Sequence, residues 1–207
     1  MNYKLIVAHC KNNGIGINNK LPWSIKSDLN KFSKLTKGSG NNAVVMGKYT
    51  WLSIPKIPLP QRDNLILSTT IKIDNETSKS FNNINSLKKY CEEKNYDTVW
   101  IIGGFNIYKS FLKDECLSEL YITYIDDEFE CDTFFPDYNI DGKWKLIKEE
   151  IHKLDINRDI DLHSRLHNKV YDRLYIRYND NDNDNDNDND NDNDNDNDND
   201  NDNNYTS

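Results

Sequence analysis

The chain has 207 residues, a length that predicts one domain with little room for a second. It contains no run near the about 18 consecutive apolar residues of a membrane-spanning helix, and its first residues form too short an apolar stretch for a signal peptide. We therefore expect a cytoplasmic protein without a membrane partner. Its 4 cysteines lie far apart and lack a C-x-x-C pair, which predicts reduced, mostly buried thiols rather than a disulfide framework or a zinc site (Cys10, Cys91, Cys116 and Cys131).

The formal net charge of −9 arises from an unbroken Asn-Asp repeat over residues 179–202, which holds 12 aspartates. The first 178 residues keep all 26 basic and 23 of the 35 acidic residues, a formal charge of +3. This body suits a small anionic ligand, and it lacks the basic run with interleaved aromatic residues that would make nucleic acid a main partner. The repeat has no aliphatic side chain to bury. The sequence therefore divides into a folded domain over 1–178 and a disordered, low-complexity tail over 179–207.

The first predicted element is a strand over 4–8, where the apolar run KLIVA is typical of a strand buried on both faces. The polar, glycine-containing segment over 9–23 predicts a long loop, and long loops in small domains are usually functional. A helix follows, with Ser27 as the expected N-cap and apolar residues at helical spacing, and it should end near Gly38.

Further strands are predicted over 43–46, 64–68, 98–102 and 120–125, from runs of β-branched and aromatic residues. Helical patterns separate them, one after Ser86 and one after Gly104. The segments 144–153 and 169–178 have no helix between them, which predicts an antiparallel pair at a sheet edge joined by a polar surface loop. This order predicts an α/β domain with a mainly parallel sheet.

Two strand-to-helix turns could hold phosphate. At Gly103 and Gly104, missing Cβ atoms would let a phosphate approach the backbone N–H groups of a helix start, although a tight turn alone explains two glycines equally well. Gly47, Lys48 and Thr50 offer backbone donors, a cation and a hydroxyl, or simply begin a capped helix with a solvated lysine. The earlier G-I-G lacks the third glycine of a dinucleotide fingerprint and is weak alone.

Three further candidate functional sites can also be interpreted as residues without a functional role. Asp28 is either a half-buried acid or a charge that complements the helix dipole. Arg62 is either a carboxylate clamp or a solvent-facing arginine. His163 and His167 have the i, i+4 spacing of metal ligands, but no third ligand has recognisable spacing, so we expect solvated histidines and no metal site.

The order of the motifs resolves these alternatives. The succession GIGINNKLPW, SDL-x-x-F, VVMGKYTWLSI, PLPQRDNLILS, WIIGGFNIY and LYITYIDDEFECDTFFPD strongly resembles dihydrofolate reductase. The resemblance covers about the first 138 residues and resumes at VYDRLYIRY. It implies a mixed sheet with helices on both faces, and transfer of a hydride from NADPH to C6 of 7,8-dihydrofolate with protonation at N5. The product, 5,6,7,8-tetrahydrofolate, would supply one-carbon metabolism and thymidylate synthesis.

The resemblance also assigns roles at the pterin. Asp28 would be the only acid of the site, bonded to N3 and the 2-amino group; Thr123 would hydrogen-bond this carboxylate and Trp23 would hold an ordered water. Leu21 would lie on a mobile loop over the nicotinamide, and Tyr108 would face that ring. The catalytic set is thus Asp28, Trp23, Leu21, Thr123 and Tyr108. The substrate set is Ala8, Asp28, Leu29, Phe32, Ile54, Leu59, Thr123 and Arg62, the last for the α-carboxylate of the glutamate tail.

The implied cofactor site surrounds the same turns. Gly103, Gly104 and Ile107 match the pyrophosphate turn, and Lys48 and Thr50, with Ser68 and Thr69, match positions near the 2′-phosphate, which favours NADPH over NADH. The full set is Ala8, Ile15, Gly16, Gly47, Lys48, Tyr49, Thr50, Leu67, Ser68, Thr69, Ile102, Gly103, Gly104, Phe105, Asn106, Ile107 and Tyr108. Asp132 and Thr133 match a segment that braces the Leu21 loop.

Two alternatives share the fold. A reductase of riboflavin synthesis needs no pterin-binding acid after LPW, and a folate-binding protein without turnover could retain the pocket. Asp28, Trp23 and Arg62 favour folate over the first, and the retention of Thr123, Tyr108 and both glycines argues against the second. Nothing in the sequence resembles an appended thymidylate synthase domain, so we expect a monofunctional enzyme. We also expect a monomer.

Overall fold

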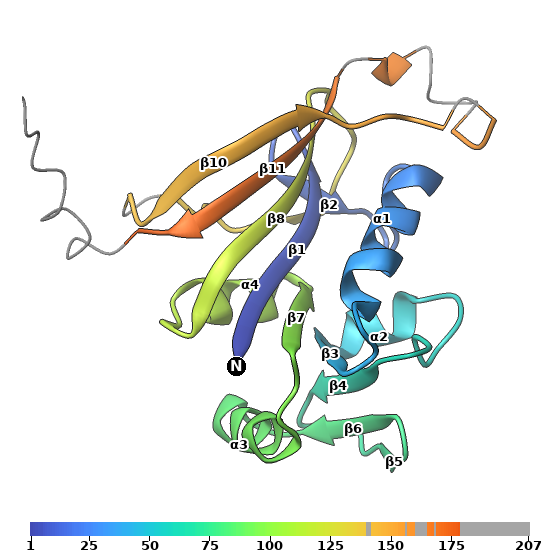
Figure 1. Ribbon diagram of the computed structural model, residues 1–207. Helices are drawn as coiled ribbons and strands as arrows, with labels where there is room; N and C mark the ends of the chain where they lie inside the picture. The colour runs from blue at the N-terminus through green and yellow to red at the C-terminus, as the bar shows by residue number, and fades with distance from the viewer. Residues whose placement is uncertain (140–141, 156, 160–164, 168, 179–207) are drawn as a thin grey trace, which may run out of the picture.

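The computed structural model describes residues 1–139, 142–155, 157–159, 165–167 and 169–178. The predicted tail over 179–207 and His163 lie outside the described residues. Within them, nine strands form one sheet in the order β10-β11-β8-β1-β7-β3-β4-β6-β5 (Figure 1). Its strands are β1 (Asn2–Cys10), β3 (Asn42–Gly47), β4 (Asp63–Leu67), β5 (Asp74–Asn75), β6 (Ser78–Phe81), β7 (Thr98–Gly103), β8 (Leu117–Ile125), β10 (Trp144–Ile151) and β11 (Val170–Arg177).

The centre of the sheet is parallel and both edges are antiparallel, since β5 also runs antiparallel to β6. The β1 strand pairs in parallel with β7 and β8, and parallel pairing continues through β3, β4 and β6. The β11 strand runs antiparallel to both β8 and β10. The predicted α/β fold with a mainly parallel sheet and an antiparallel C-terminal edge is therefore confirmed.

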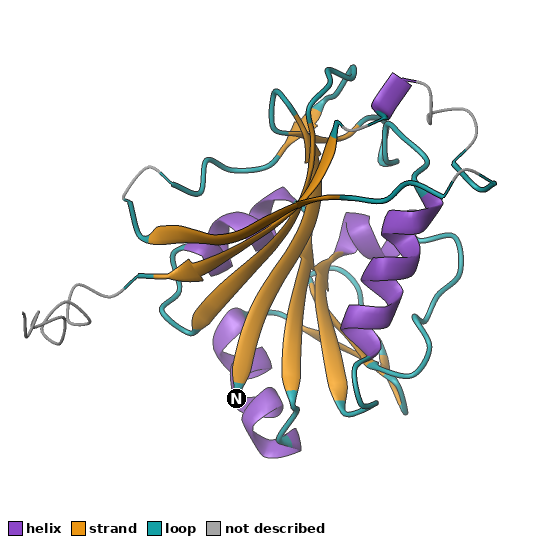
Figure 2. Ribbon diagram, turned by 45° about the horizontal axis from the view of Figure 1, so that its top comes forward, coloured by secondary structure: helices purple, strands orange, loops and turns teal. Residues whose placement is uncertain are grey.

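In the described part of the chain, longer helices lie on the two faces of this sheet (Figure 2): α1 (Lys26–Lys37), α2 (Lys48–Ser53), α3 (Ile84–Lys94) and α4 (Phe105–Leu112). Alternate residues of β1 enter different clusters, because successive side chains of a strand point to opposite faces. Leu5 and Val7 pack with α3 and α4, whereas Ile6 packs with residues of α1 and α2. The unbroken apolar run in the sequence thus reflects a strand that is covered on both faces.

A third apolar cluster lies beneath the start of α1, at the carboxyl end of β1. It joins Cys10, Trp23, Ile25, Ile125, Leu166 and Val170. The connection between β10 and β11 was predicted to be a polar surface loop, and for its described residues this is only partly right. Asp159 and Leu166 are buried, at 2% and 0% exposure, because they close the space under the helix start.

Two helix starts differ from the prediction. Helix α1 begins at Lys26 rather than after a Ser27 N-cap, and its cap residue Ile25 makes no side-chain cap bond. Asp159 supplies the missing acceptor instead, since Lys26 N donates to its Oδ1 at 2.6 Å and Ser27 Oγ donates to its Oδ2 at 2.6 Å. Helix α3 begins at Ile84 because the Asn83 side chain accepts from Ser86 N at 2.8 Å. The predicted end of α1 at Gly38 is confirmed.

The expected loop over 9–23 contains a short strand. The β2 strand (Gly14–Gly16) pairs antiparallel with β9 (Thr133–Phe134), so part of the loop is held by a distant segment. Cys10 and Cys91 are buried and Cys116 and Cys131 are partly exposed, and all four are free thiols. Among the described residues, no helix combines the length and apolar character needed to span a bilayer.

Candidate active site

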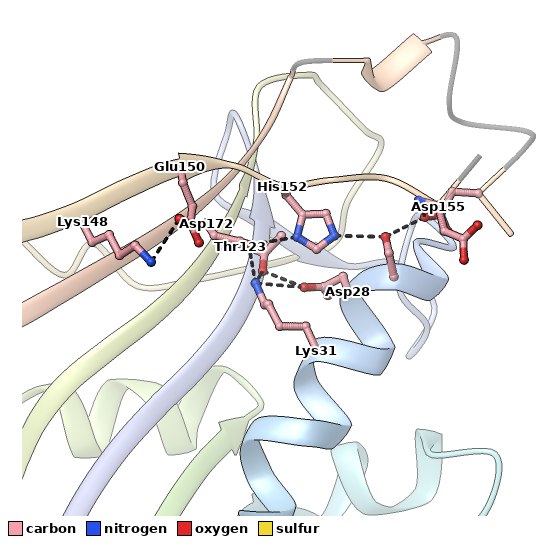
Figure 3. A network of polar contacts seen from close by, with 10 residues as sticks. Asp28, Lys31, Thr123, Lys148, Glu150, His152, Asp155 and Asp172 are labelled. Carbon is pink, nitrogen blue, oxygen red and sulfur yellow. Dashed lines mark hydrogen bonds and ion pairs between the residues drawn. The ribbon is translucent and has the colours of Figure 1, made fainter. Parts of the chain in front are cut away.

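The first part of the site lies where β1, β8 and the start of α1 meet. Thr123 on β8 is paired with Ala8 on β1, near the carboxyl ends of both strands. Its hydroxyl donates to Asp28 Oδ1 at 2.7 Å (Figure 3). Asp28 is only 9% exposed although it stands in the first turn of a helix. The acid is therefore a largely buried, hydrogen-bonded carboxylate and more than a surface charge at a helix N-terminus.

A lysine absent from the sequence-based site lies beside this acid. Lys31 Nζ is 3.5 Å from Asp28 Oδ1, donates to Thr123 Oγ1 at 2.6 Å, and forms an ion pair with Asp172 of β11. Asp28 was expected to be the only acid of the site. The structure places a second carboxylate nearby, because Asp172 pairs with the same lysine, and the expectation for the pterin site itself stays a prediction. Burial acts to raise the pKa of Asp172, but the hydrogen bond from His152 and the charge of Lys31 hold it below its usual value.

The same network continues to the helix start. His152 Nδ1 lies 2.9 Å from Asp172 Oδ2, and its Nε2 lies 3.0 Å from Ser27 Oγ, which in turn donates to Asp159. Burial acts to raise the pKa of Asp159, but the bonds from the Ser27 hydroxyl and from backbone N–H groups lower it. Figure 3 shows this chain of polar contacts running from β11 to the N-terminus of α1.

The loop before α1 combines a buried and an exposed residue. Trp23 is 6% exposed and packs edge-on against Phe129, with 5.3 Å between the ring centroids, whereas Leu21 is 49% exposed. Asn18 N donates to Asp132 Oδ2 at 2.7 Å, and Thr133 pairs with Gly16, so the segment expected to brace this loop does contact it. A cavity of about 380 Å³ separates Asn18, Asn19 and Lys20 from Tyr49, Leu52 and Ser53 of α2.

Apart from Ala8 on β1 and Thr123 on β8, the residues assigned to the folate pocket fall on α1 and on the segment after α2. Phe32, Ile54 and Leu59 are partly buried against the same apolar cluster, and Ala8 is partly buried. Leu29 is 46% exposed. Arg62 is 5% exposed, so the solvent-facing reading of this residue is wrong. Its Nε donates to Pro60 O at 2.9 Å and its Nη1 donates to Thr36 Oγ1, which fixes the guanidinium against α1, and burial lowers its pKa.

The two glycine turns predicted to hold phosphate lie side by side. They follow the paired strands β3 and β7, and a Cβ on Gly47 would lie 3.2 Å from Ile107 of the second turn. A Cβ on Gly104 would lie 3.4 Å from Thr50 Oγ1 of the first turn. Gly103 has φ of 103° and packs against the Tyr108 ring, whose hydroxyl donates to Ile6 O at 3.0 Å. Burial raises the pKa of Tyr108.

The remaining cofactor candidates surround these turns. Lys48 Nζ donates to Thr70 Oγ1 at 3.1 Å, and Ser68 Oγ accepts from Thr70 N and Ile71 N, both at 3.2 Å. Ile15 and Leu67 pack against the larger core cluster and Ile102 against the second. Tyr49 and Phe105 are exposed, at 70% and 40%, and Thr69 and Asn106 are exposed too. The sequence analysis did not include Thr70, which contacts both Lys48 and Ser68.

Metal ligation has no support in the part of the chain that the structure describes, which contains no group of three or more His, Cys, Asp or Glu placed to hold an ion. His167 is among these residues, whereas His163 is not.

Known proteins carry the same combination of sequence features. A family model described as dihydrofolate reductase matches residues 2–169. The chain belongs to the dihydrofolate reductase family. The dihydrofolate reductase of Drosophila melanogaster is 42% identical over 146 residues, which are 66% of this chain and 80% of that protein. The Gallus gallus enzyme is 40% identical over 157 residues (70% and 82%), and the Buchnera aphidicola enzyme is 37% identical over 150 residues (71% and 86%).

Membership of the dihydrofolate reductase family confirms the resemblance seen in the sequence and with it the expected fold. It disfavours the riboflavin-pathway alternative. Family membership also indicates, in general terms, that the site uses a nicotinamide cofactor and a folate substrate. The sequence-based site omitted Lys31, His152, Asp159 and Asp172. Of these, Lys31 alone carried a local signal, because a residue three positions after Asp28 shares its helix face.

Proposed function

We propose that this chain reduces 7,8-dihydrofolate to 5,6,7,8-tetrahydrofolate with NADPH as the hydride donor and Asp28 as the acid that binds the pterin. The observation that carries the proposal is the buried Asp28 carboxylate, held by Thr123 at 2.7 Å at the carboxyl end of the sheet. Ligands of open α/β sheets bind at that end. A buried carboxylate there is costly unless it has a partner, and a pterin that gains positive charge is such a partner.

Asp28 would act by electrostatics and orientation. Its two oxygens match the N3 and 2-amino donors of the pterin, and its charge favours a proton at N5. A hydride that arrives at C6 needs positive character on the C6=N5 bond, so a preorganised carboxylate stabilises the reacting state more than the ground state. Thr123 would hold the carboxylate in this orientation, while Trp23 and Leu21 would limit access of water from the loop side.

The chain offers a matching cradle for the cofactor. NADPH supplies the hydride when it is bound. Gly103 and Gly104 would let its pyrophosphate approach the N-terminus of α4, since neither residue carries a Cβ that would shield the backbone N–H groups. Lys48, bonded to Thr70 beside Ser68, would receive the extra phosphate that distinguishes NADPH from NADH. Tyr108, anchored to Ile6 O, would form the wall at the nicotinamide.

The primary assay is the loss of the NADPH absorbance band when purified protein meets dihydrofolate, beside NADH and a control without folate. Folate-dependent oxidation supports the reaction and the cofactor together. Oxidation that does not depend on folate, or tight binding of both ligands without turnover, overturns the proposal and favours a folate binder.

Asp28→Asn separates the role of the acid from general damage to the site. We expect turnover near neutral pH to fall about 100-fold or more, because the pterin charge loses its partner. The Kd for NADPH should change less than about twofold, since no cofactor group is assigned to this carboxylate. Asp74→Asn is the matched control, because it removes an exposed carboxylate paired with Lys79 far from the site. Equal losses of turnover and NADPH affinity in Asp28→Asn contradict the assigned role.

Lys48→Gln tests the preference for NADPH. Loss of one charge-assisted contact should raise the Kd for NADPH about tenfold and leave that for NADH unchanged. Lys72→Gln is the control, because Lys72 is an exposed lysine of the following connection. A parallel rise for both cofactors contradicts a contact with the 2′-phosphate. A monomeric state and a cytoplasmic location remain predictions of the sequence, to be tested by sedimentation and by fractionation.

A further inference from the structure

Lys31 presents a problem for the proposed mechanism. Its ammonium group lies 3.5 Å from Asp28 Oδ1, the carboxylate whose negative charge is needed for the pterin. An uncompensated cation at this distance competes with a protonated pterin for the same oxygens and lowers the tendency of N5 to hold a proton. The side chains of Lys31 and Asp28 are 25% and 13% exposed, so water screens their interaction only in part.

Asp172 provides the compensation. It is directly opposite Thr123 in the antiparallel pairing of β11 with β8, which brings its carboxylate to the far side of Lys31. His152 Nδ1 holds its second oxygen at 2.9 Å, and Ser27 holds the other ring nitrogen at 3.0 Å. Asp172 is thus fixed in place by a residue outside the pterin pocket, and its pKa is lowered by His152 and Lys31 against the effect of burial.

Lys31 also controls the hydroxyl of Thr123. An ammonium group can only donate, so the contact at 2.6 Å makes Thr123 Oγ1 an acceptor toward Lys31. The single hydroxyl hydrogen of Thr123 is then directed to Asp28 Oδ1 at 2.7 Å. One arrangement of the three side chains therefore keeps Asp28 oriented, provided that Lys31 remains turned toward Asp172 and Thr123.

We propose that Asp172 and Lys31 are a pair of positioning residues for the reduction, in which Asp172 neutralises Lys31 so that Lys31 does not compete with the pterin for the Asp28 carboxylate. This inference rests on the proposed function. Among the described residues, the charged or titratable groups around Asp28 are Lys31 on its own helix, Asp172 on β11 and His152 beyond β10, with Asp159 beneath the helix start. Neither residue of the pair needs to contact substrate for this role.

The test measures how readily a bound ring is protonated. The probe is 2,4-diaminopteridine, which presents two N–H donors to a carboxylate once its ring is protonated, and whose absorbance reports that protonation. We expect Asp172→Asn to lower the apparent pKa of the bound probe by about one unit, because Lys31 then has Asp28 as its nearest carboxylate. The pH at which turnover of dihydrofolate is half-maximal should fall with it, while the Kd for NADPH stays within about twofold.

The double variant is the decisive control. In Lys31→Met with Asp172→Asn, the unpaired cation is gone, so the probe pKa should return to within about 0.3 unit of wild type. Lys31→Met alone should raise it, because Asp172 then adds an uncompensated negative charge. Asp74→Asn, which breaks an exposed lysine pair, should change nothing. A general loss of structure cannot produce opposite shifts in two single variants and recovery in the double one.

The outcomes separate this inference from the proposed function. An unchanged probe pKa in both single variants, or a double variant as perturbed as Asp172→Asn, overturns the pairing role. Absence of folate-dependent NADPH oxidation by the wild-type chain overturns the proposed function, whereas the probe titration still reports the charge network. If Asp172→Asn lowers the melting temperature too far for titration, the rise expected for Lys31→Met decides the question, and no rise refutes it.

Discussion

Asp159 offers the sharpest test of how the candidate site is supported. Its carboxylate accepts from Lys26 N at 2.6 Å, Ser27 Oγ at 2.6 Å and Asp155 N at 2.9 Å, at 2% exposure. Hydrogen bonds to a charged group contribute about 1.5 to 3 kcal/mol each and do not add fully. Asp159→Asn keeps one acceptor oxygen but turns an NH₂ group toward donors, so we expect a loss of about 3 kcal/mol in the free energy of unfolding.

The measurement is urea unfolding followed by tryptophan fluorescence, because Trp23 lies in the apolar cluster beneath the same helix start. For a domain of this size, the expected loss corresponds to a fall in Tm of about 6 to 12 °C. Asp74→Asn is the matched control, since its carboxylate is 73% exposed in an ion pair with Lys79. Such a pair contributes at most about 1 kcal/mol.

The pH dependence of this stability difference decides whether Asp159 caps the helix as a charged carboxylate. The pKa of Asp159 is lowered in the folded state, so its stabilisation is present above the ordinary carboxyl pKa and is lost as the pH falls through the folded value. The difference between wild type and Asp159→Asn should be constant from about pH 6 to 8 and shrink below about pH 4. A difference under about 1 kcal/mol at neutral pH, or one that persists unchanged into acid, refutes the capping role.

Gly103→Ala places a Cβ 2.7 Å from Tyr108 Cε2 at a positive φ of 103°, so we expect a loss of about 2 to 4 kcal/mol in urea unfolding and an NADPH Kd raised more than tenfold; unchanged values contradict the tight turn. Tyr108→Phe keeps the ring and leaves Ile6 O without its partner, which should cost about 1 to 2 kcal/mol, and a neutral effect contradicts this bond. Removal of residues 179–207, which have no aliphatic side chain, should leave turnover and Tm nearly unchanged; a clear loss of either would mean that the repeat contacts the body.

The long buried strands could be predicted because each is recognisable from its own run of apolar residues. Within the predicted strands 4–8 and 98–102, residues 5–8 and 99–102 are all apolar, and the structure covers both of their faces. Strands β2, β5, β6 and β9 could not be predicted in this way, since each has two to four residues and exists only through pairing with another segment. The start of α1 was wrong for the same reason, because its acceptor is Asp159, 133 positions after Lys26.

The candidate site shows the same difference between residues that local motifs indicate and residues that only distant packing brings in. Asp28, Thr123, Lys48 and the two glycine turns follow from motifs whose order resembles one family, and the structure brings Asp28 into contact with Thr123 and one glycine turn against the other. Lys31 could have been noted from its spacing to Asp28. His152 and Asp172 carry no local signal, because only the packing of the last strands against β8 gives them their partners.

The register of β11 therefore has a chemical consequence. A slip of one residue against β8 would turn Asp172 to the opposite face of the sheet and leave Lys31 with Asp28 as its nearest carboxylate partner. The burial of Val170 and Tyr175 favours the observed register, and the bond from His152 holds Asp172 within it. The pairing of β11 at the sheet edge thus determines whether Lys31 is neutralised by Asp172 or acts as an uncompensated cation beside Asp28. Substitutions that shift β11 should consequently change the pH profile of the reaction even where they touch no residue of the pterin pocket.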